Sequence, residues 1–351
     1  MWFIIQFILW FVFILTALIC TAMYIRKHYS LPFECDELHF AKSADGLFLA
    51  LYHLKPEKIR YEQPVMLMHG MSSNRFNLHF KKGFSLAEYL RDRGFDVWLP
   101  EMRGRGKSDW PERGYTFDDI GRFDIPAFIE RIQQLTGRKE VLYLGHSMGG
   151  MVLYAYLATH QNSPIRAAIA AGSPSKIGKN PMTVLAPLLK ITGVFSFWVY
   201  ANLMLPFMGF LKHYRFEFNP ENLDNRLIRE MTANSVERES AALMLQFADW
   251  IRSGRFESVD GVDYVKEMAK LDRPLLFMSG QKDRLVPPDT IKPAFESAPD
   301  QFRSWVTLGS DSGLLRDYGH VDMLMGYGAA EEVYPLVNDW FVRHADAVKD
   351  Q

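Results

Sequence analysis

The hydrophobic pattern begins with one uninterrupted apolar stretch. Residues 2–24 contain no charged side chain, and Arg26 and Lys27 follow at once. A helix of about 23 residues rises roughly 34 Å, which is enough to cross a hydrocarbon core of about 30 Å. We therefore expect residues 1–28 to form a single membrane-spanning anchor.

A cleaved signal peptide is the alternative interpretation of this segment. Signal peptides carry a basic region before the apolar core and small residues at the cleavage site. Here Met1 leads directly into Trp2, and no small-x-small site follows the run. The pattern favours an uncleaved anchor. Because Arg26 and Lys27 lie at the C-terminal end of the anchor, the positive-inside rule predicts that the next domain faces the cytoplasm.

Beyond residue 36, short β-like runs alternate with helical patterns. Two runs flank the turn signal Asp45-Gly46 and predict a hairpin over residues 36–54. Strands are expected at 64–68, 95–99, 141–144, 165–171, 274–278 and 305–308, and helices at 84–93, 125–135, 148–160 and 330–344. This alternation predicts an α/β fold with a mainly parallel sheet, helices on both faces and antiparallel edge strands from the hairpin.

The alternation stops between residues 173 and 272. We interpret 173–272 as a helical cap with an acyl-binding groove, inserted into a core made of residues 36–172 and 273–345. The stretch is rich in aromatic residues: Phe195, Phe197, Trp198, Tyr200, Phe207, Phe210, Tyr214, Phe216 and Phe218. A second membrane span over 182–211 is the alternative. Its charge and two prolines argue against it: Lys190, Pro187 and Pro206.

Composition narrows the class of protein. The 351 residues are 48% hydrophobic and 23% charged, which is typical of a globular chain. The net charge is −1, so no basic excess indicates a nucleic-acid partner. Cys20 lies in the apolar stretch and Cys35 is the only other cysteine, so a disulfide framework is not expected. The oligomeric state stays open.

Ser147 lies in the sequence Gly145-x-Ser147-x-Gly149, between an expected strand and an expected helix. A serine at such a sharp turn has strained backbone dihedrals, and its glycine neighbours let strand and helix approach closely. Its hydroxyl projects at the carboxyl end of the sheet, and the helix N-terminus points at developing negative charge. The motif predicts a nucleophile, with an incidental serine in a tight turn as the alternative.

A serine nucleophile needs a base and an orienting carboxylate. In a strand–serine–helix arrangement of this kind the chain order is serine, acid, histidine. Asp283 follows the expected strand at 274–278, and His320 follows the last expected strand, so we expect both in the site. Other acids and histidines are less well placed: Asp260, Asp272, His160 and His344.

The developing oxyanion needs two backbone N–H donors. We expect them from Met148, next to the nucleophile, and from Met71, after the early strand. His69 is expected to shape that loop, with a catalytic role as the alternative. No phosphate-binding loop or paired metal-ligand motif occurs, and Gly104-x-Gly106 lacks the third glycine of a dinucleotide site. No cofactor or metal is therefore expected.

The chain resembles the α/β-hydrolase superfamily over residues 36–345, and within it the acid lipase family of gastric and lysosomal lipases. The resemblance lies in Met68-His69-Gly70-Met71, Phe95 to Leu99 with Arg103-Gly104, Phe117 to Ala127, the elbow around Ser147, and Tyr318 to Asp322. It implies Ser147, Asp283 and His320 as the triad and ester lipids as substrates. Met148 and Gly150 follow the elbow pattern common in monoacylglycerol lipases and esterases.

The leading hypothesis is a membrane-anchored lipase or esterase that acts through an acyl-enzyme. An acyltransferase or polyester-synthase-like enzyme with the same triad is the second, although polyester synthases carry cysteine where this chain has Ser147. A non-catalytic binding protein is the third, but all three triad positions are filled. Epoxide hydrolases and dehalogenases of this fold carry an aspartate at the elbow, so Ser147 argues against both.

Overall fold

One eight-stranded sheet forms the centre of the computed structural model, which describes residues 2–160, 162–177, 204–207 and 216–348. The strand order is β1-β2-β4-β3-β5-β6-β7-β8. The strands are β1 (Glu37–Lys42), β2 (Phe48–Leu54), β3 (Val65–Met68), β4 (Val97–Pro100), β5 (Val141–His146), β6 (Ile165–Ala171), β7 (Leu275–Gly280) and β8 (Arg303–Leu308). Strands β3 to β8 are parallel, and β1 and β2 form an antiparallel edge. The predicted mainly parallel sheet is confirmed.

The predicted turn at Asp45-Gly46 closes the β1–β2 hairpin. The Ser43 N–H donates to the Leu47 carbonyl at 2.9 Å, and the Gly46 N–H donates back to the Ser43 carbonyl at 2.9 Å. Gly46 has φ +95°, a conformation that only glycine adopts without strain. The hairpin is therefore set by its own turn residues.

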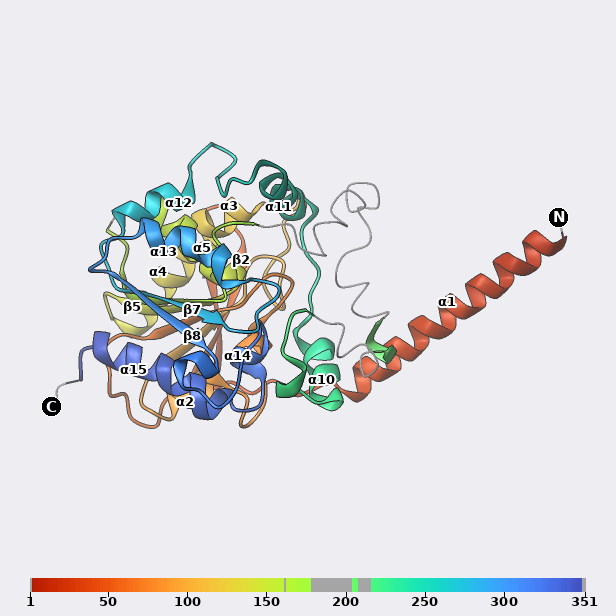
Figure 1. The fold of residues 1–351 in the computed structure, drawn as a ribbon, viewed down its shortest axis with the longest axis horizontal. Helices are drawn as coiled ribbons and strands as arrows, with labels where there is room; N and C mark the ends of the chain where they lie inside the picture. The colour runs from red at the N-terminus through yellow and green to blue at the C-terminus, as the bar shows by residue number, and fades with distance from the viewer. Residues whose placement is uncertain (1, 161, 178–203, 208–215, 349–351) are drawn as a thin grey trace.

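Helices cover both faces of the sheet (Figure 1). One layer contains α3 (Phe117–Asp119), η2 (Ile120–Asp124), α4 (Ile125–Thr136), α5 (Met148–Thr159) and α13 (Pro288–Ser297). The opposite layer contains α2 (Leu86–Arg91), α14 (Asp322–Met325), η8 (Ala329–Val333) and α15 (Tyr334–His344). Two short turns lie in loops: η1 (Arg75–Asn77) and η7 (Ser310–Ser312). Each layer buries its own apolar core against the sheet, with Val152 in one and Val337 in the other.

The segment between β6 and β7 contains short helices joined by loops in its described residues. It contains η3 (Leu205–Phe207), η5 (Pro220–Asn222), α10 (Asn225–Ser235), α11 (Ala241–Ser253), α12 (Tyr264–Glu267) and η6 (Met268–Lys270). Helices α12 and η6 contact the core helices α5 and α13. We therefore use a narrower definition than the predicted 173–272, and from here the cap means residues 204–207 and 216–253. Six of the aromatic residues predicted for the cap lie outside the described residues: Phe195, Phe197, Trp198, Tyr200, Phe210 and Tyr214. Most of the alternative span at 182–211 also lies outside them.

Helix α1 (Trp2–His28) projects from the domain (Figure 1). Within the described chain it is the one helix long and apolar enough to cross a membrane. Its side chains from Trp2 to Ala17 are exposed. Its last turn carries Arg26, Lys27 and His28.

Candidate active site

Ser147 occupies a strained turn between β5 and α5. Its backbone has φ 55° and ψ −120°, and α5 begins at the next residue, Met148. A positive φ in a non-glycine residue costs of order 1–3 kcal/mol and persists only where the surroundings impose it. Here the Ser147 N–H donates to the carbonyl of Ala171 in β6 at 2.8 Å, which ties the turn to the neighbouring strand.

The two motif glycines are required by close backbone contacts. A Cβ on Gly145 would lie 2.4 Å from the Gly149 backbone. A Cβ on Gly149 would lie 2.6 Å from the Met68 carbonyl oxygen at the end of β3. Any larger residue at either position would push α5 away from the sheet and displace Ser147.

His320 and Asp283 are joined by a buried hydrogen bond. His320 Nδ1 donates to Asp283 Oδ2 at 2.8 Å, and both side chains are almost fully buried. The other oxygen, Asp283 Oδ1, accepts the backbone N–H groups of Leu285 at 3.0 Å and Val286 at 2.7 Å. These bonds fix the carboxylate, and the carboxylate leaves His320 Nε2 available as a base.

Ser147 and His320 line the same cavity, which has a volume of about 510 Å³. Apolar side chains from the cap form much of its wall: Phe218, Ile228, Met231, Met244, Phe247 and Ile251. The cavity therefore combines Ser147 and His320 with an apolar surface suited to hydrocarbon.

Met71 and Met148, the predicted oxyanion donors, also line this cavity. Within the described part of the chain, neither backbone N–H donates a hydrogen bond to the protein. The loop before Met71 lies against the elbow, because a Cβ on Gly70 would be only 3.1 Å from the Ser147 Cβ. Among the described residues both N–H groups therefore lack an acceptor, which is consistent with the predicted oxyanion role.

His146 is a site residue that the sequence analysis missed. Its Nε2 lies 2.9 Å from the His320 carbonyl oxygen, and its Nδ1 lies 2.9 Å from Asn77 Oδ1. Burial and the neighbouring His320 lower the pKa of His146 to about 3, so the ring is neutral. The sequence did offer one indication of this role, because His146 lies inside the elbow motif, next to Ser147. The ring braces the His320 loop against the elbow.

Asp322, at the start of α14, links the His320 loop to the cap. It accepts the Gly319 N–H at 3.0 Å, the Asn219 N–H at 2.9 Å and the Asn222 side-chain amide at 2.7 Å. Burial raises the pKa of Asp322. The cap therefore helps to position His320.

His69 shapes the loop that carries Met71. The Met102 N–H donates to its Nε2 at 3.3 Å, so its Nδ1 carries the proton and donates to the Gly70 carbonyl at 2.9 Å. Burial lowers the pKa of His69 to about 3. A neutral ring with both nitrogens engaged by the backbone suits a structural role.

The other candidate acids and histidines lie apart from Ser147. Asp260 forms an exposed ion pair with Arg122, and Asp272 pairs with Arg273 next to it in sequence. His160 Nδ1 lies 3.2 Å from the Tyr156 carbonyl, and His344 contacts the Trp340 ring. None of the four is among the residues that line the cavity.

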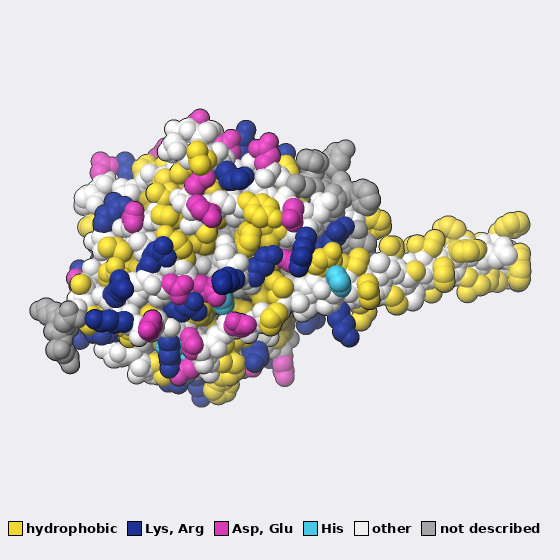
Figure 2. Space-filling model, turned by 90° about the horizontal axis from the view of Figure 1, so that it is seen from below, with side chains coloured by type: hydrophobic (Ala, Val, Ile, Leu, Met, Phe, Trp, Pro, Cys, Tyr) yellow, Lys and Arg dark blue, Asp and Glu magenta, His cyan; other side chains and the backbone are white. Residues whose placement is uncertain are grey.

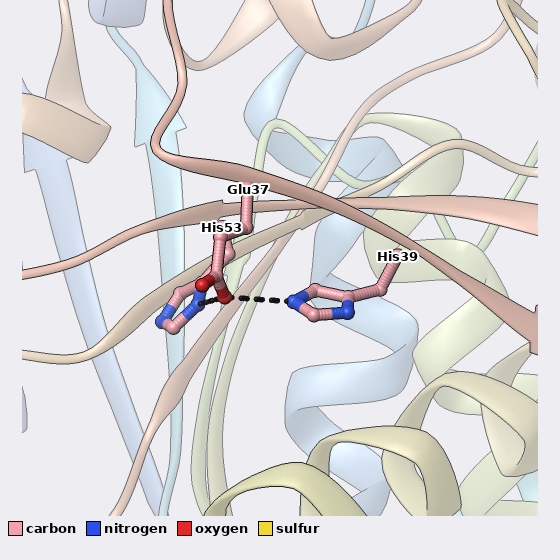
Figure 3. Close-up of side chains that lie close together, drawn as sticks. All are labelled: Glu37, His39 and His53. Carbon is pink, nitrogen blue, oxygen red and sulfur yellow. Dashed lines mark hydrogen bonds and ion pairs between the residues drawn. The ribbon is translucent and has the colours of Figure 1, made fainter.

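Glu37, His39 and His53 converge on the β1–β2 hairpin (Figure 3), a group that the sequence analysis did not predict. Glu37 Oε2 lies 2.9 Å from His39 Nε2 and 3.4 Å from His53 Nδ1. Their ligand atoms could hold a divalent cation. However, Lys55 already pairs with Glu37, and Asp96 binds His53 Nε2 at 2.5 Å. These contacts favour a role in joining the hairpin to the sheet.

Comparisons with known proteins agree with this geometry. A family model described as the alpha/beta hydrolase fold matches residues 63–324. Human lipase member M is 25% identical, over 88% of this chain and 82% of that protein. Rat gastric triacylglycerol lipase is 29% identical over 36% of each chain.

Solved structures share the fold. An esterase from Exiguobacterium antarcticum has a TM-score of 0.60 and 20% identity, covering 86% of this chain and 98% of that chain. A monoacylglycerol lipase from Paleococcus ferrophilus has a TM-score of 0.58 and 20% identity, covering 84% and 99%. The chain therefore belongs to the α/β-hydrolase fold family and is a carboxylic ester hydrolase that resembles the acid lipases.

Proposed function

We propose that this enzyme hydrolyses lipid acyl esters through an acyl-enzyme on Ser147, while α1 holds it at a membrane. One observation carries the proposal. His320, held by Asp283 in a buried hydrogen bond, and Ser147, in its strained turn, line the same largely apolar cavity. A surface serine and histidine in a binding protein would not require this arrangement.

In the proposed first step, Ser147 Oγ attacks the ester carbonyl carbon while His320 Nε2 takes its proton. The N–H groups of Met71 and Met148 bind the oxyanion that forms. His320 then gives the proton to the departing alcohol, which leaves the acyl group on Ser147. Asp283 keeps the imidazole in the correct tautomer and stabilises its charged form.

In the second step, water attacks the acyl-enzyme. His320 removes a proton from the water, the acyl–oxygen bond to Ser147 breaks, and the serine recovers its proton from His320. The products are a free fatty acid and the regenerated enzyme. An acyltransferase would use the same residues with an alcohol or thiol in place of water, so only the product distinguishes the two.

The cavity supports an acyl chain as the group that is bound. Each methylene transferred from water to an apolar wall contributes about 0.8 kcal/mol. The apolar cap wall, which includes Phe218, Met231 and Phe247, would therefore favour longer chains. The lipase relatives support the same substrate class.

Helix α1 supports the membrane location. Its length and exposed apolar surface suit an uncleaved anchor, and the basic last turn suits a cytoplasmic domain. Protease treatment of intact cells tests this topology. The domain should resist digestion until the membrane is opened, and digestion from outside would contradict it.

A graded series of acyl esters tests the hydrolytic proposal. The wild-type enzyme should release acid from long-chain esters, and Ser147→Ala should lose this activity. Ser235→Ala is a matched control, because Ser235 lines the cavity and its buried hydroxyl makes no hydrogen bond in the described structure. Equal activity of wild type and Ser147→Ala would refute the mechanism. Acyl transfer to an added alcohol without acid release would indicate a transferase.

A further inference from the structure

The last turns of α1 are packed against the cap. Arg26 and four apolar or aromatic side chains are partly or fully buried here, whereas most of their neighbours on the helix are exposed. The four are Leu18, Ala22, Ile25 and Tyr29. Ala22 is only 3% exposed. Their spacing of three and four residues places them on one face of the helix. This segment of α1 contacts both η3 and α10 of the cap.

Hydrogen bonds fix the end of α1 to α10. The Asn234 side-chain amide donates to the Tyr29 carbonyl at 2.8 Å and accepts the Leu31 N–H at 2.9 Å. On the other side, Asn74 from the core donates to the Asn234 carbonyl at 2.9 Å. The anchor, the cap and the core therefore meet at Asn234.

Helix α10 also forms part of the cavity wall. Ile228, Met231, Thr232 and Ser235 line the cavity, and Asn234 on the same helix holds the anchor. The position of the anchor relative to the cavity is thus set by one helix of 11 residues.

The length of α1 locates the membrane surface. Sixteen residues, Trp2 to Ala17, precede the buried face, and they rise about 24 Å. A hydrocarbon core of about 30 Å needs roughly 20 residues and would reach about Thr21 if it begins at Trp2. Burial of the α1 side chains starts at Leu18, and α1 contacts η3 and α10 of the cap. The hydrocarbon boundary therefore falls within the stretch of helix that the cap covers.

Resting on the function proposed above, we propose that the cap is seated in the bilayer interface, with η3 inserted beside α1. The cavity then receives its ester from the membrane that holds the anchor. Figure 2 shows the hydrophobic surface of α1 continuing up to the domain, where basic side chains begin. Phe207 in η3 is 41% exposed, although it is a large apolar side chain. The substrate class is an ester lipid resident in the membrane.

An environment-sensitive probe on Phe207 tests the insertion. A full-length Cys20→Ala, Cys35→Ser background receives a single Phe207→Cys change, is labelled with a nitrobenzoxadiazole dye, and is placed in phosphatidylcholine vesicles. Val259→Cys is the matched control, because Val259 is 72% exposed and its loop between α11 and α12 lies away from α1 in Figure 1. Nitroxide-labelled lipids should quench the probe at position 207 and spare the probe at 259.

The outcomes separate this inference from the proposed function. Equal aqueous emission from both probes would overturn the inference, as would a probe at 207 that is shielded from water but not quenched by lipid. Phe207→Asp should lower hydrolysis of a long-chain ester in vesicles by roughly tenfold, with little change on a soluble short-chain nitrophenyl ester. A wild-type enzyme that cleaves neither ester would refute the function, and the probe result would still decide the insertion.

Discussion

Asp283 accepts the Nδ1–H of His320 at 2.8 Å while its other oxygen accepts the Val286 N–H at 2.7 Å. The carboxylate is therefore held from both sides, and it presents one imidazole tautomer to Ser147. This pair joins the loop after β7 to the loop after β8. It explains how two loops that lie 37 residues apart in sequence act as one unit.

Asp283→Asn should lower kcat by about 10³–10⁴-fold with little change in KM. The amide can donate to His320 Nδ1 and so favours the tautomer whose Nε2 carries the proton. Steady-state kinetics on a soluble nitrophenyl ester would measure the loss. Asp260→Asn, at an exposed ion pair, should keep wild-type kcat. A kcat for Asp283→Asn within threefold of wild type would assign the orienting role elsewhere.

His69 should make the folded state sensitive to acid. Its pKa is lowered to about 3 by burial, whereas an unfolded histidine titrates near 6.5. The unfolded state thus binds more protons as pH falls from about 6.5 to 3, so stability is lost over that window. Between pH 7 and pH 5 the loss from this one group is about 2 kcal/mol.

Chemical unfolding of the detergent-solubilised enzyme at the two pH values would measure this effect. The free energy of unfolding should differ less between pH 7 and pH 5 in His69→Gln than in wild type, by about 2 kcal/mol, because glutamine does not titrate in this range. An unchanged pH dependence in the variant would mean that His69 is protonated in the folded enzyme.

Asp124→Ala should destabilise the fold by about 3–5 kcal/mol. Asp124 is buried and binds Arg103 through the Arg103 Nε at 2.7 Å and backbone N–H at 2.9 Å. Its loss would leave a buried guanidinium with Asp45 as its one remaining charged partner among the described residues. Asp260→Ala removes an exposed pair with Arg122 and should cost less than about 1 kcal/mol. If both variants lose a similar free energy of unfolding, the buried pair does not stabilise the fold more than the exposed pair does.

Met231→Trp should shift the chain-length preference. Met231 lies on the cavity wall contributed by α10, and a larger ring there would fill space that an acyl chain needs. We expect kcat/KM to fall by roughly tenfold on long-chain esters, equivalent to about two methylenes of binding. Short-chain esters provide the internal control. Equal losses on short and long chains would indicate damage to the triad rather than to an acyl site.

Much of the core fold could be predicted because its signals are local. The strand before Ser147, the glycines around it and the helix after it lie within one short window of sequence. Arg103 and Asp124 lie in two separate stretches of sequence that resemble the acid lipases. In the structure the two residues form one buried ion pair. Pattern alone could not reveal that pairing.

Other features depend on contacts between distant segments. Helix α13 was not predicted, and it contains Pro288 in its first turn and Pro293 in its interior. Ser175, in the segment after β6, binds this helix at two points. Its Oγ accepts the Ala294 N–H at 2.9 Å, and its own N–H donates to the Thr290 carbonyl at 2.9 Å. The bonds from Asn234 to the end of α1 span more than 200 residues. No local periodicity encodes such contacts.

Covalent labelling of Ser147 tests the central claim most directly. The membrane fraction would be treated with a fluorophosphonate, and the modified peptide would be mapped by mass spectrometry in wild type and in Ser147→Ala. We predict one modified serine, Ser147, and no labelling in the variant. Labelling that persists in Ser147→Ala, or a wild-type enzyme that stays unmodified while it cleaves esters, would contradict the acyl-enzyme mechanism.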